Sequence, residues 1–149
     1  MRAVIQRVSS ASVKINGILK DEIKLGLLIL LGIEENDNQE DIEWLVSKIL
    51  NMRLFADQDN KMNLDLTDIG GELMVVSQFT LYASTKKGNR PSFVKSARPD
   101  IAEKIYRDFI KAIEKRHGKI HTGTFGAMMD VSLINSGPVT ILIDSKNRE

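Results

Sequence analysis

The chain has 149 residues, of which 42% are hydrophobic and 28% charged, as is typical of one soluble globular domain, and it is too short for two. Its formal net charge of +1 excludes a global attraction to nucleic acid or membrane, so any polyanion has to bind a local patch. The lack of cysteine excludes disulfides, thiolate metal sites and a cysteine nucleophile, and a count of two histidines argues against a histidine-rich zinc site.

The first part of the chain predicts three strands and a helix. Residues 2–15 are rich in Val, Ile and Ser, and Asn16-Gly17 follows where a two-residue turn is expected, so we predict strand, turn and strand. Residues 25–33 form a continuous apolar run that suits a strand buried on both faces, although a buried helix segment has the same pattern. After a polar loop at 34–40, the spacing predicts a helix over 39–52. The apolar face of this helix comprises Ile42, Leu45, Val46, Ile49 and Leu50.

The middle of the chain alternates between strand and loop patterns. A short strand is expected at 53–55, followed by a long polar loop at 57–71 that ends in a Gly-Gly pair. Residues 72–83 predict one continuous, strongly apolar strand. Residues 84–99 contain five Lys or Arg side chains, one glycine and two prolines, which indicates a basic, mobile loop.

The last part predicts a second helix and three further strands. The helix spans 99–117, with Pro99 suited to its first turn and Gly118 to its end. Strands are expected near 119–124, 128–134 and 139–144. Together these elements predict one α+β domain over residues 1–149, with a mostly antiparallel or mixed, barrel-like sheet and two main helices. No signal-peptide core or bilayer-length apolar run is present, so we expect a cytoplasmic protein without membrane contact.

The sequence contains neither a phosphate-binding glycine loop of the P-loop type nor a dinucleotide fingerprint, so we expect no cofactor. We also expect no metal, because the chain has no cysteine and only two histidines. A Ser-His-Asp triad would have to recruit His117 or His121 across the fold, and the position of His117 at a helix end is already explained by the helix dipole. The pattern therefore argues against nucleotide-dependent chemistry and against a serine-hydrolase triad.

Two segments place polar or unusual residues within predicted strands. In Ser77-Gln78-Phe79-Thr80-Leu81-Tyr82, strand periodicity directs Gln78, Thr80 and Tyr82 to one face. In Asn135-Ser136-Gly137-Pro138-Val139-Thr140, proline removes a backbone donor and glycine allows angles that are closed to other residues. Taken alone, Thr80 fits an ordinary strand threonine. The Gly-Pro pair fits either a tight turn or a recognition element built from backbone.

Taken together, the two segments resemble the two signature motifs of the D-aminoacyl-tRNA deacylase family. Residues 1–8 and 88–93 are also similar to that family, so the resemblance extends along the whole chain. It implies an enzyme that hydrolyses the ester between a D-amino acid and the 3′-terminal adenosine of tRNA and rejects the L form. It also implies a homodimer, and a filter built on steric exclusion predicts activity on glycyl-tRNA, including glycine mischarged on tRNA(Ala).

The resemblance also implies roles for the motif residues. Within Ser77, Gln78, Phe79 and Thr80, the backbone N–H groups of Gln78 and Phe79 are candidates to stabilise an oxyanion. Thr80 is the suspected nucleophile or water-positioning group. Because no general base adjoins it in the sequence, we favour hydrolysis assisted by the 2′-hydroxyl of the tRNA.

The resemblance implies that the second motif distinguishes D- from L-aminoacyl esters. In the family the bond that corresponds to Gly137-Pro138 is cis, and the pair from one subunit enters the pocket of the other, where its backbone collides with an L side chain. Asn135 and Ser136 belong to the same motif. Arg7 is implied to hold the Gly-Pro backbone through its planar guanidinium.

The basic loop offers a contact for tRNA. Lys86, Lys87 and Arg90 either bind phosphates of the acceptor end or form an ordinary solvated loop. Two other functions remain open, an editing deacylase for L-aminoacyl-tRNA with a trans Gly-Pro bond, and a non-catalytic RNA-binding module. An aromatic content of 5% leaves few stacking platforms and argues against the latter.

Overall fold

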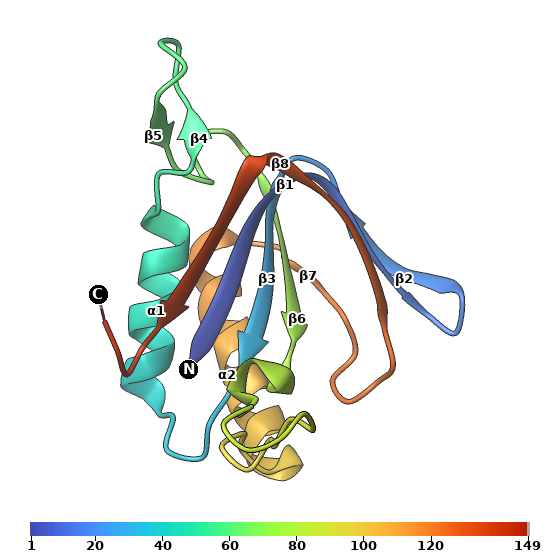
Figure 1. Cartoon of the computed structure of the whole chain (residues 1–149). Coiled ribbons are helices and arrows are strands. Elements are labelled where there is room, and N and C mark those ends of the chain that lie inside the picture. The colour runs from blue at the N-terminus through green and yellow to red at the C-terminus, as the bar shows by residue number, and fades with distance from the viewer. Residues whose placement is uncertain (149) are drawn as a thin grey trace.

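The sheet is organised around strand β1 (Arg2–Ile15), which pairs antiparallel with three other strands. Along one edge it pairs first with β3 (Gly26–Gly32) and then with β2 (Ile18–Ile23), and along the other edge with β8 (Asp130–Asp144). This computed structural model describes residues 1–148 (Figure 1). The predicted hairpin is confirmed, because Asn16 and Gly17 adopt φ values of 51° and 77°, as a type I′ turn requires.

The rest of the sheet is parallel. β3 pairs with β6 (Glu72–Ser77), and β6 pairs with the short strand β7 (His121–Thr122), both in parallel. Residues of β3 are almost all buried, which confirms the strand with two covered faces. The predicted α+β class with a mixed sheet is therefore confirmed.

The sheet curls until its ends approach each other. Asp21 on β2 accepts hydrogen bonds from the ring of His121 and from the backbone N–H of Thr122 on β7, although β2 and β7 stand at opposite ends of the strand order. These contacts link β2 to β7 and complete a nearly closed, barrel-like sheet, as expected.

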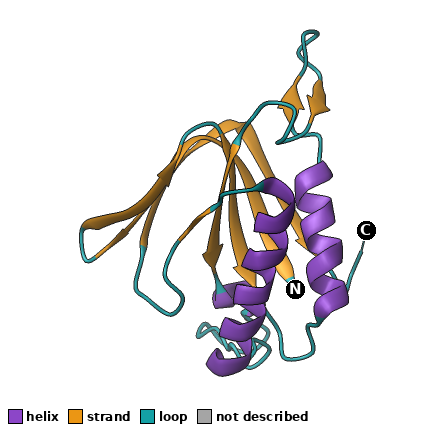
Figure 2. Ribbon diagram, turned by 180° about the vertical axis from the view of Figure 1, so that it is seen from behind, coloured by secondary structure: helices purple, strands orange, loops and turns teal. Residues whose placement is uncertain are grey.

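Both helices cover the same face of the sheet (Figure 2). α1 (Gln39–Asn51) begins with a capping box between Asn38 and Asp41. α2 (Pro99–His117) has the predicted bounds and ends at Gly118, where φ is 96°. The core between helices and sheet includes the fully buried Ile5, Ile29, Leu45, Ile49, Phe109 and Ile113. No helix among residues 1–148 has the length and apolar character needed to cross a membrane.

The predicted strand over 72–83 is wrong in its second half. β6 ends at Ser77, and a single turn of 3-10 helix, η1 (Phe79–Tyr82), follows. The neighbouring strand β3 ends at Gly32, so residues beyond Gln78 have no strand to pair with and form local bonds instead. Strand alternation therefore does not hold for Thr80 and Tyr82.

The last two predicted strands form one element, and two short strands are displaced. β8 runs continuously from Asp130 to Asp144 but contains a large bulge. Gln6 of β1 pairs with Thr140 and Val8 pairs with Asn135, so an advance of two residues along β1 corresponds to five residues along β8. The strand expected at 53–55 lies instead at β4 (Phe55–Ala56). It pairs with β5 (Met62–Leu64) inside the predicted loop, and the strand near 119–124 is reduced to β7.

Candidate active site

A cavity of about 660 Å³ opens where β6 passes into η1. Its size lies within the range of small-molecule sites. Three sequence-predicted residues, Ser77, Gln78 and Phe79, form one wall. The other walls come from the loop before α2, from the N-terminal end of α2, from buried strand residues and from the segment between β7 and β8. The residues outside the motif are Leu31, Ile33, Val76, Phe93, Ser96, Ala97, Arg98, Pro99, Ala102, Phe125, Gly126, Ala127, Met128, Met129 and Val131.

Backbone donors in the first motif are not equivalent. The N–H of Gln78 donates to the carbonyl of Leu31 at 2.8 Å, as the last bond of the β3–β6 ladder. It is therefore already used, and the expectation that it stabilises an oxyanion does not fit this geometry. The N–H of Phe79 has no acceptor within residues 1–148 and stands beside the cavity, so it remains a candidate donor.

Side chains around η1 hold its backbone. Phe79 is 58% exposed, and its ring packs edge-on against Phe93 with centroids 5.1 Å apart. The Ser96 hydroxyl donates to the carbonyl of Phe79 at 2.8 Å. Arg2 donates to the carbonyl of Leu81, also in η1, at 3.1 Å. The turn that carries the first motif is thus held by two side-chain hydrogen bonds to its carbonyls.

Thr80 has no basic partner. Its hydroxyl is exposed, does not line the cavity, and accepts a hydrogen bond from the Gln78 amide at 2.6 Å, its single hydrogen bond within residues 1–148. Burial raises the pKa of Tyr82 far above its usual range, so this neighbour stays protonated and cannot serve as a base. His117 and His121 do not line the cavity either. The arrangement therefore offers no side chain of the described residues to activate the Thr80 hydroxyl.

The second motif lies in the bulge of β8. Gly137 has a φ of 118°, and the Gly137-Pro138 peptide is cis. Arg7 donates from Nε to the carbonyl of Ser136 at 2.9 Å and from a terminal nitrogen to the carbonyl of Leu54. A Cβ on Gly137 would stand 2.1 Å from the Arg7 guanidinium. Any other L residue here would be strained by this φ and would displace the Arg7 guanidinium.

The amide of Asn135 closes the same bulge. It donates to the carbonyl of Val139 at 2.9 Å, across the Gly-Pro pair. Gly137 and Pro138 themselves are exposed. The structure therefore brings together Arg7, Asn135, Ser136 and the Gly-Pro pair, and it presents that pair on the surface.

Within one chain the two motifs lie far apart. Ser77 pairs with Leu31 of β3, whereas Arg7, beside Gly137, pairs with Leu27. Four residues of strand span roughly 13 Å, and the order β8-β1-β3-β6 places β8 roughly 14 Å from β6. Figure 1 shows the bend of β8 at the upper end of the sheet and the turn after β6 at its lower end. Neither Gly137 nor Pro138 lines the cavity.

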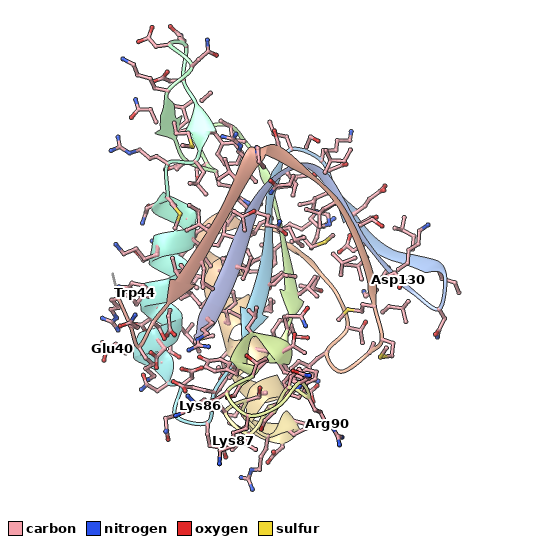
Figure 3. All side chains as sticks on the ribbon, in the orientation of Figure 1. Glu40, Trp44, Lys86, Lys87, Arg90 and Asp130 are labelled. Carbon is pink, nitrogen blue, oxygen red and sulfur yellow. The ribbon has the colours of Figure 1, made fainter. Side chains whose placement is uncertain are left out.

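The predicted tRNA-binding residues lie near the cavity. Lys86, Lys87 and Arg90 are exposed and project from the end of the molecule that carries η1 (Figure 3). Their loop is closed by paired backbone hydrogen bonds between Ser84 and Ser92. Arg98, on the same loop, is ion-paired with Glu35 at 3.3 Å. No three His, Asp or Glu side chains of residues 1–148 are grouped to hold a metal.

Sequence reasoning missed the cavity wall formed by residues 125–129. The strand expected near 128–134 includes Met128 and Met129, but β8 begins at Asp130. Gly126, with a φ of 75°, marks a turn there, and Met128 is 88% exposed, which is unusual for a strand within a sheet. Gly126 was the one signal in the sequence that separated this loop from the strand.

Comparison with known proteins identifies relatives along nearly the whole chain. The family model described as D-Tyr-tRNA(Tyr) deacylase matches residues 4–144. The D-aminoacyl-tRNA deacylase of Flavobacterium johnsoniae is 57% identical over 100% of both chains. A solved structure described as a c-Myc DNA Unwinding Element Binding Protein is 41% identical, with a TM-score of 0.91 over 97% of this chain and 98% of that chain.

A second solved structure, a probable eukaryotic D-amino acid tRNA deacylase, shares the fold. It has a TM-score of 0.82 and 16% identity over 95% of this chain and 97% of that chain. The match to the family model and the identity to the Flavobacterium enzyme both extend over nearly the whole sequence. The chain therefore belongs to the D-Tyr-tRNA(Tyr) deacylase family.

Proposed function

We propose that this protein, an ester hydrolase of D-aminoacyl-tRNA, works as a homodimer with composite sites. In each site the cavity beside Ser77 and Phe79 of one protomer receives the Gly137-Pro138 pair of the other. The observation that carries this proposal is the separation of the two motifs within one chain, with the Gly-Pro pair exposed. In a homodimer, a second copy supplies the half of the site that each chain lacks.

In such a site the backbone of Gly137-Pro138 rejects L-aminoacyl esters. An enzyme that accepts many D-amino acids has to recognise the part of the substrate that all of them share. A rigid backbone can do this by a steric clash with the side chain of an L-amino acid. A preference of about ten-thousandfold for the D over the L ester needs a free-energy difference of about 5.5 kcal/mol. A steric clash supplies this difference, whereas the loss of one methylene contact does not. Arg7 supports this rigidity because it holds the carbonyl of Ser136.

Hydrolysis adds water across the ester and releases free tRNA and the D-amino acid. The N–H of Phe79 is available to stabilise the negative charge that develops on the carbonyl oxygen. Because Thr80 has no basic neighbour, water activation falls to the ribose 2′-hydroxyl of the terminal adenosine. The groups that act on the ester are then mainly a backbone N–H of the protein and a hydroxyl of the RNA.

Thr80→Val is expected to lower kcat by less than about tenfold, because its hydroxyl bonds only to the Gln78 amide within residues 1–148. A tRNA that ends in 2′-deoxyadenosine should lose more activity with the wild-type enzyme than Thr80→Val loses with normal tRNA. The comparison is between two single-turnover rates, that of the wild-type enzyme with the 2′-deoxy tRNA and that of Thr80→Val with normal tRNA. A loss of four orders of magnitude in a folded Thr80→Val variant would make Thr80 the catalytic group instead.

The basic loop extends the site toward the rest of the tRNA. Lys86, Lys87 and Arg90 belong to the same loop as Phe93 and Ser96, which line the cavity. Lysine and arginine at such a position bind phosphates without reading sequence. Action on charged tRNA also accounts for the cytoplasmic location expected from the sequence.

The decisive experiment compares three substrates with the purified protein: D-tyrosyl-tRNA, L-tyrosyl-tRNA and glycyl-tRNA. We expect fast loss of the D ester, no loss of the L ester, and measurable loss of the glycyl ester, including glycine on tRNA(Ala), because glycine has no side chain to exclude. Hydrolysis of both tyrosyl esters would indicate the L-editing type. Inertness toward all three would indicate an RNA-binding protein, and inertness toward glycyl-tRNA alone would contradict pure steric exclusion.

A further inference from the structure

One wall of the cavity is attached to the sheet at few points. The segment from Gly118 to Met129 connects α2 to β8 and contributes Phe125, Gly126, Ala127, Met128 and Met129 to the cavity. Its strand β7 pairs with β6 at only two positions, His121 opposite Met74 and Thr122 opposite Val75. A ladder this short gives the wall little rigidity by itself.

Asp21 supplies a second attachment from the other end of the strand order. Its Oδ1 lies 2.7 Å from Nδ1 of His121, and its Oδ2 accepts the N–H of Thr122 at 3.2 Å. The side chains of Asp21 and His121 are 29% and 14% exposed, so both bonds are partly shielded from water. One carboxylate thus holds a side chain and a backbone group of adjacent residues.

The charge state of Asp21 suits this role. Burial by itself would raise the pKa of its carboxyl, but hydrogen bonds from His121 and from the N–H groups of Thr122 and Glu22 bring it below the usual range. An ionised carboxylate only accepts hydrogen bonds, so Nδ1 of His121 carries the proton. The bond between them is therefore charge-assisted, which makes it stronger than a neutral one.

The attachment passes directly into the cavity wall. Gly123 follows Thr122, and a Cβ there would lie 2.4 Å from the sulfur of Met129, so Met129 is folded tightly over the segment that Asp21 holds. Phe125 packs against Tyr106 of α2 with ring centroids 5.7 Å apart. Figure 1 shows this segment, in orange, looping down from β7 before it enters β8.

We propose that Asp21 is a positioning residue for the deacylation reaction, which holds His121 and Thr122 and thereby fixes the cavity wall at residues 123–129. This inference rests on the proposed function, because it takes the cavity to receive the aminoacyl end of tRNA. Asp21 itself does not line the cavity. Asp21 therefore affects how tightly the substrate is bound, whereas other groups carry out the chemical step.

The test compares steady-state kinetics and hydrogen exchange of four variants with the wild-type enzyme. For Asp21→Ala we expect KM for D-tyrosyl-tRNA to rise about tenfold while kcat stays within about threefold, since charge-assisted bonds are lost outside the reacting centre. Backbone amides of residues 119–129 should exchange faster than in the wild type. His121→Ala should behave alike, and His121→Gln, which retains a side-chain N–H donor, should restore KM most of the way.

Asp59→Ala is the matched control, because Asp59 is an exposed aspartate in the turn between β4 and β5. It should leave KM and exchange of residues 119–129 unchanged. Faster exchange with unchanged KM in Asp21→Ala overturns the inference and leaves the proposed function standing, as does a fall in kcat alone. A wild-type enzyme that hydrolyses no D-aminoacyl-tRNA overturns both.

Discussion

Replacement of Gly137 by alanine is expected to lower kcat/KM for D-tyrosyl-tRNA by at least about a hundredfold. A Cβ at this position would lie 2.1 Å from the Arg7 guanidinium, and a φ of 118° is strained for any L residue. Strain of this kind costs about 1–3 kcal/mol, and a displacement of about 1 Å at a reacting centre costs roughly a hundredfold in rate. The Gly-Pro backbone therefore moves away from the substrate, or Arg7 releases it.

The matched control is Gly70→Ala. Gly70 also has a positive φ, 59°, but a Cβ there would meet no atom within 4 Å. Deacylation rates and melting temperatures of the two variants separate a general loss of stability from a specific collision. Equal losses of activity in both variants would mean that the close approach to Arg7 has no functional role.

Arg7→Lys is expected to reduce the ratio of D- to L-tyrosyl-tRNA hydrolysis by about tenfold to a hundredfold. The guanidinium holds the carbonyls of Ser136 and Leu54 at once, from separate nitrogens of one rigid plane. A lysine ammonium cannot reproduce that geometry, and each hydrogen bond from a charged donor contributes about 1.5–3 kcal/mol. The Gly-Pro backbone then gains freedom, and L esters enter the site.

The ratio has to be measured with both esters under one set of conditions, together with the melting temperature. Arg53→Lys serves as the control, because Arg53 is an exposed arginine with a hydrogen bond to Asn63 at 2.9 Å. It should keep the wild-type ratio. If Arg7→Lys also keeps it, Arg7 has no part in chiral rejection.

Local patterns predicted the regular elements well. The bounds of α2 were correct because Pro99 and Gly118 act through backbone angles that need no partner. The Asn16-Gly17 turn was predicted for the same reason. The strand over 72–83 failed because its apolar residues carried no sign that β3 stops at Gly32 and leaves η1 without a pairing strand.

The sequence names the residues of the two motifs, but the hydrogen bonds that these residues make depend on the fold. Arg7, Ser136 and Gly137 were expected together and lie together. The N–H of Gln78 was expected to be free, but ladder register commits it to Leu31. Asp21 and His121, 100 residues apart in sequence, had no local pattern to connect them.

The sequence by itself determined which residues form the two motifs, both helices and the hairpin, because those depend on residue type and on neighbours within a few positions. Only the tertiary structure decided which backbone donors are free, where the cavity wall is held, and that the Gly-Pro pair lies on the surface far from the cavity of its own chain. These properties arise from strand register and from the curl of the sheet, which depend on contacts between residues distant in the chain.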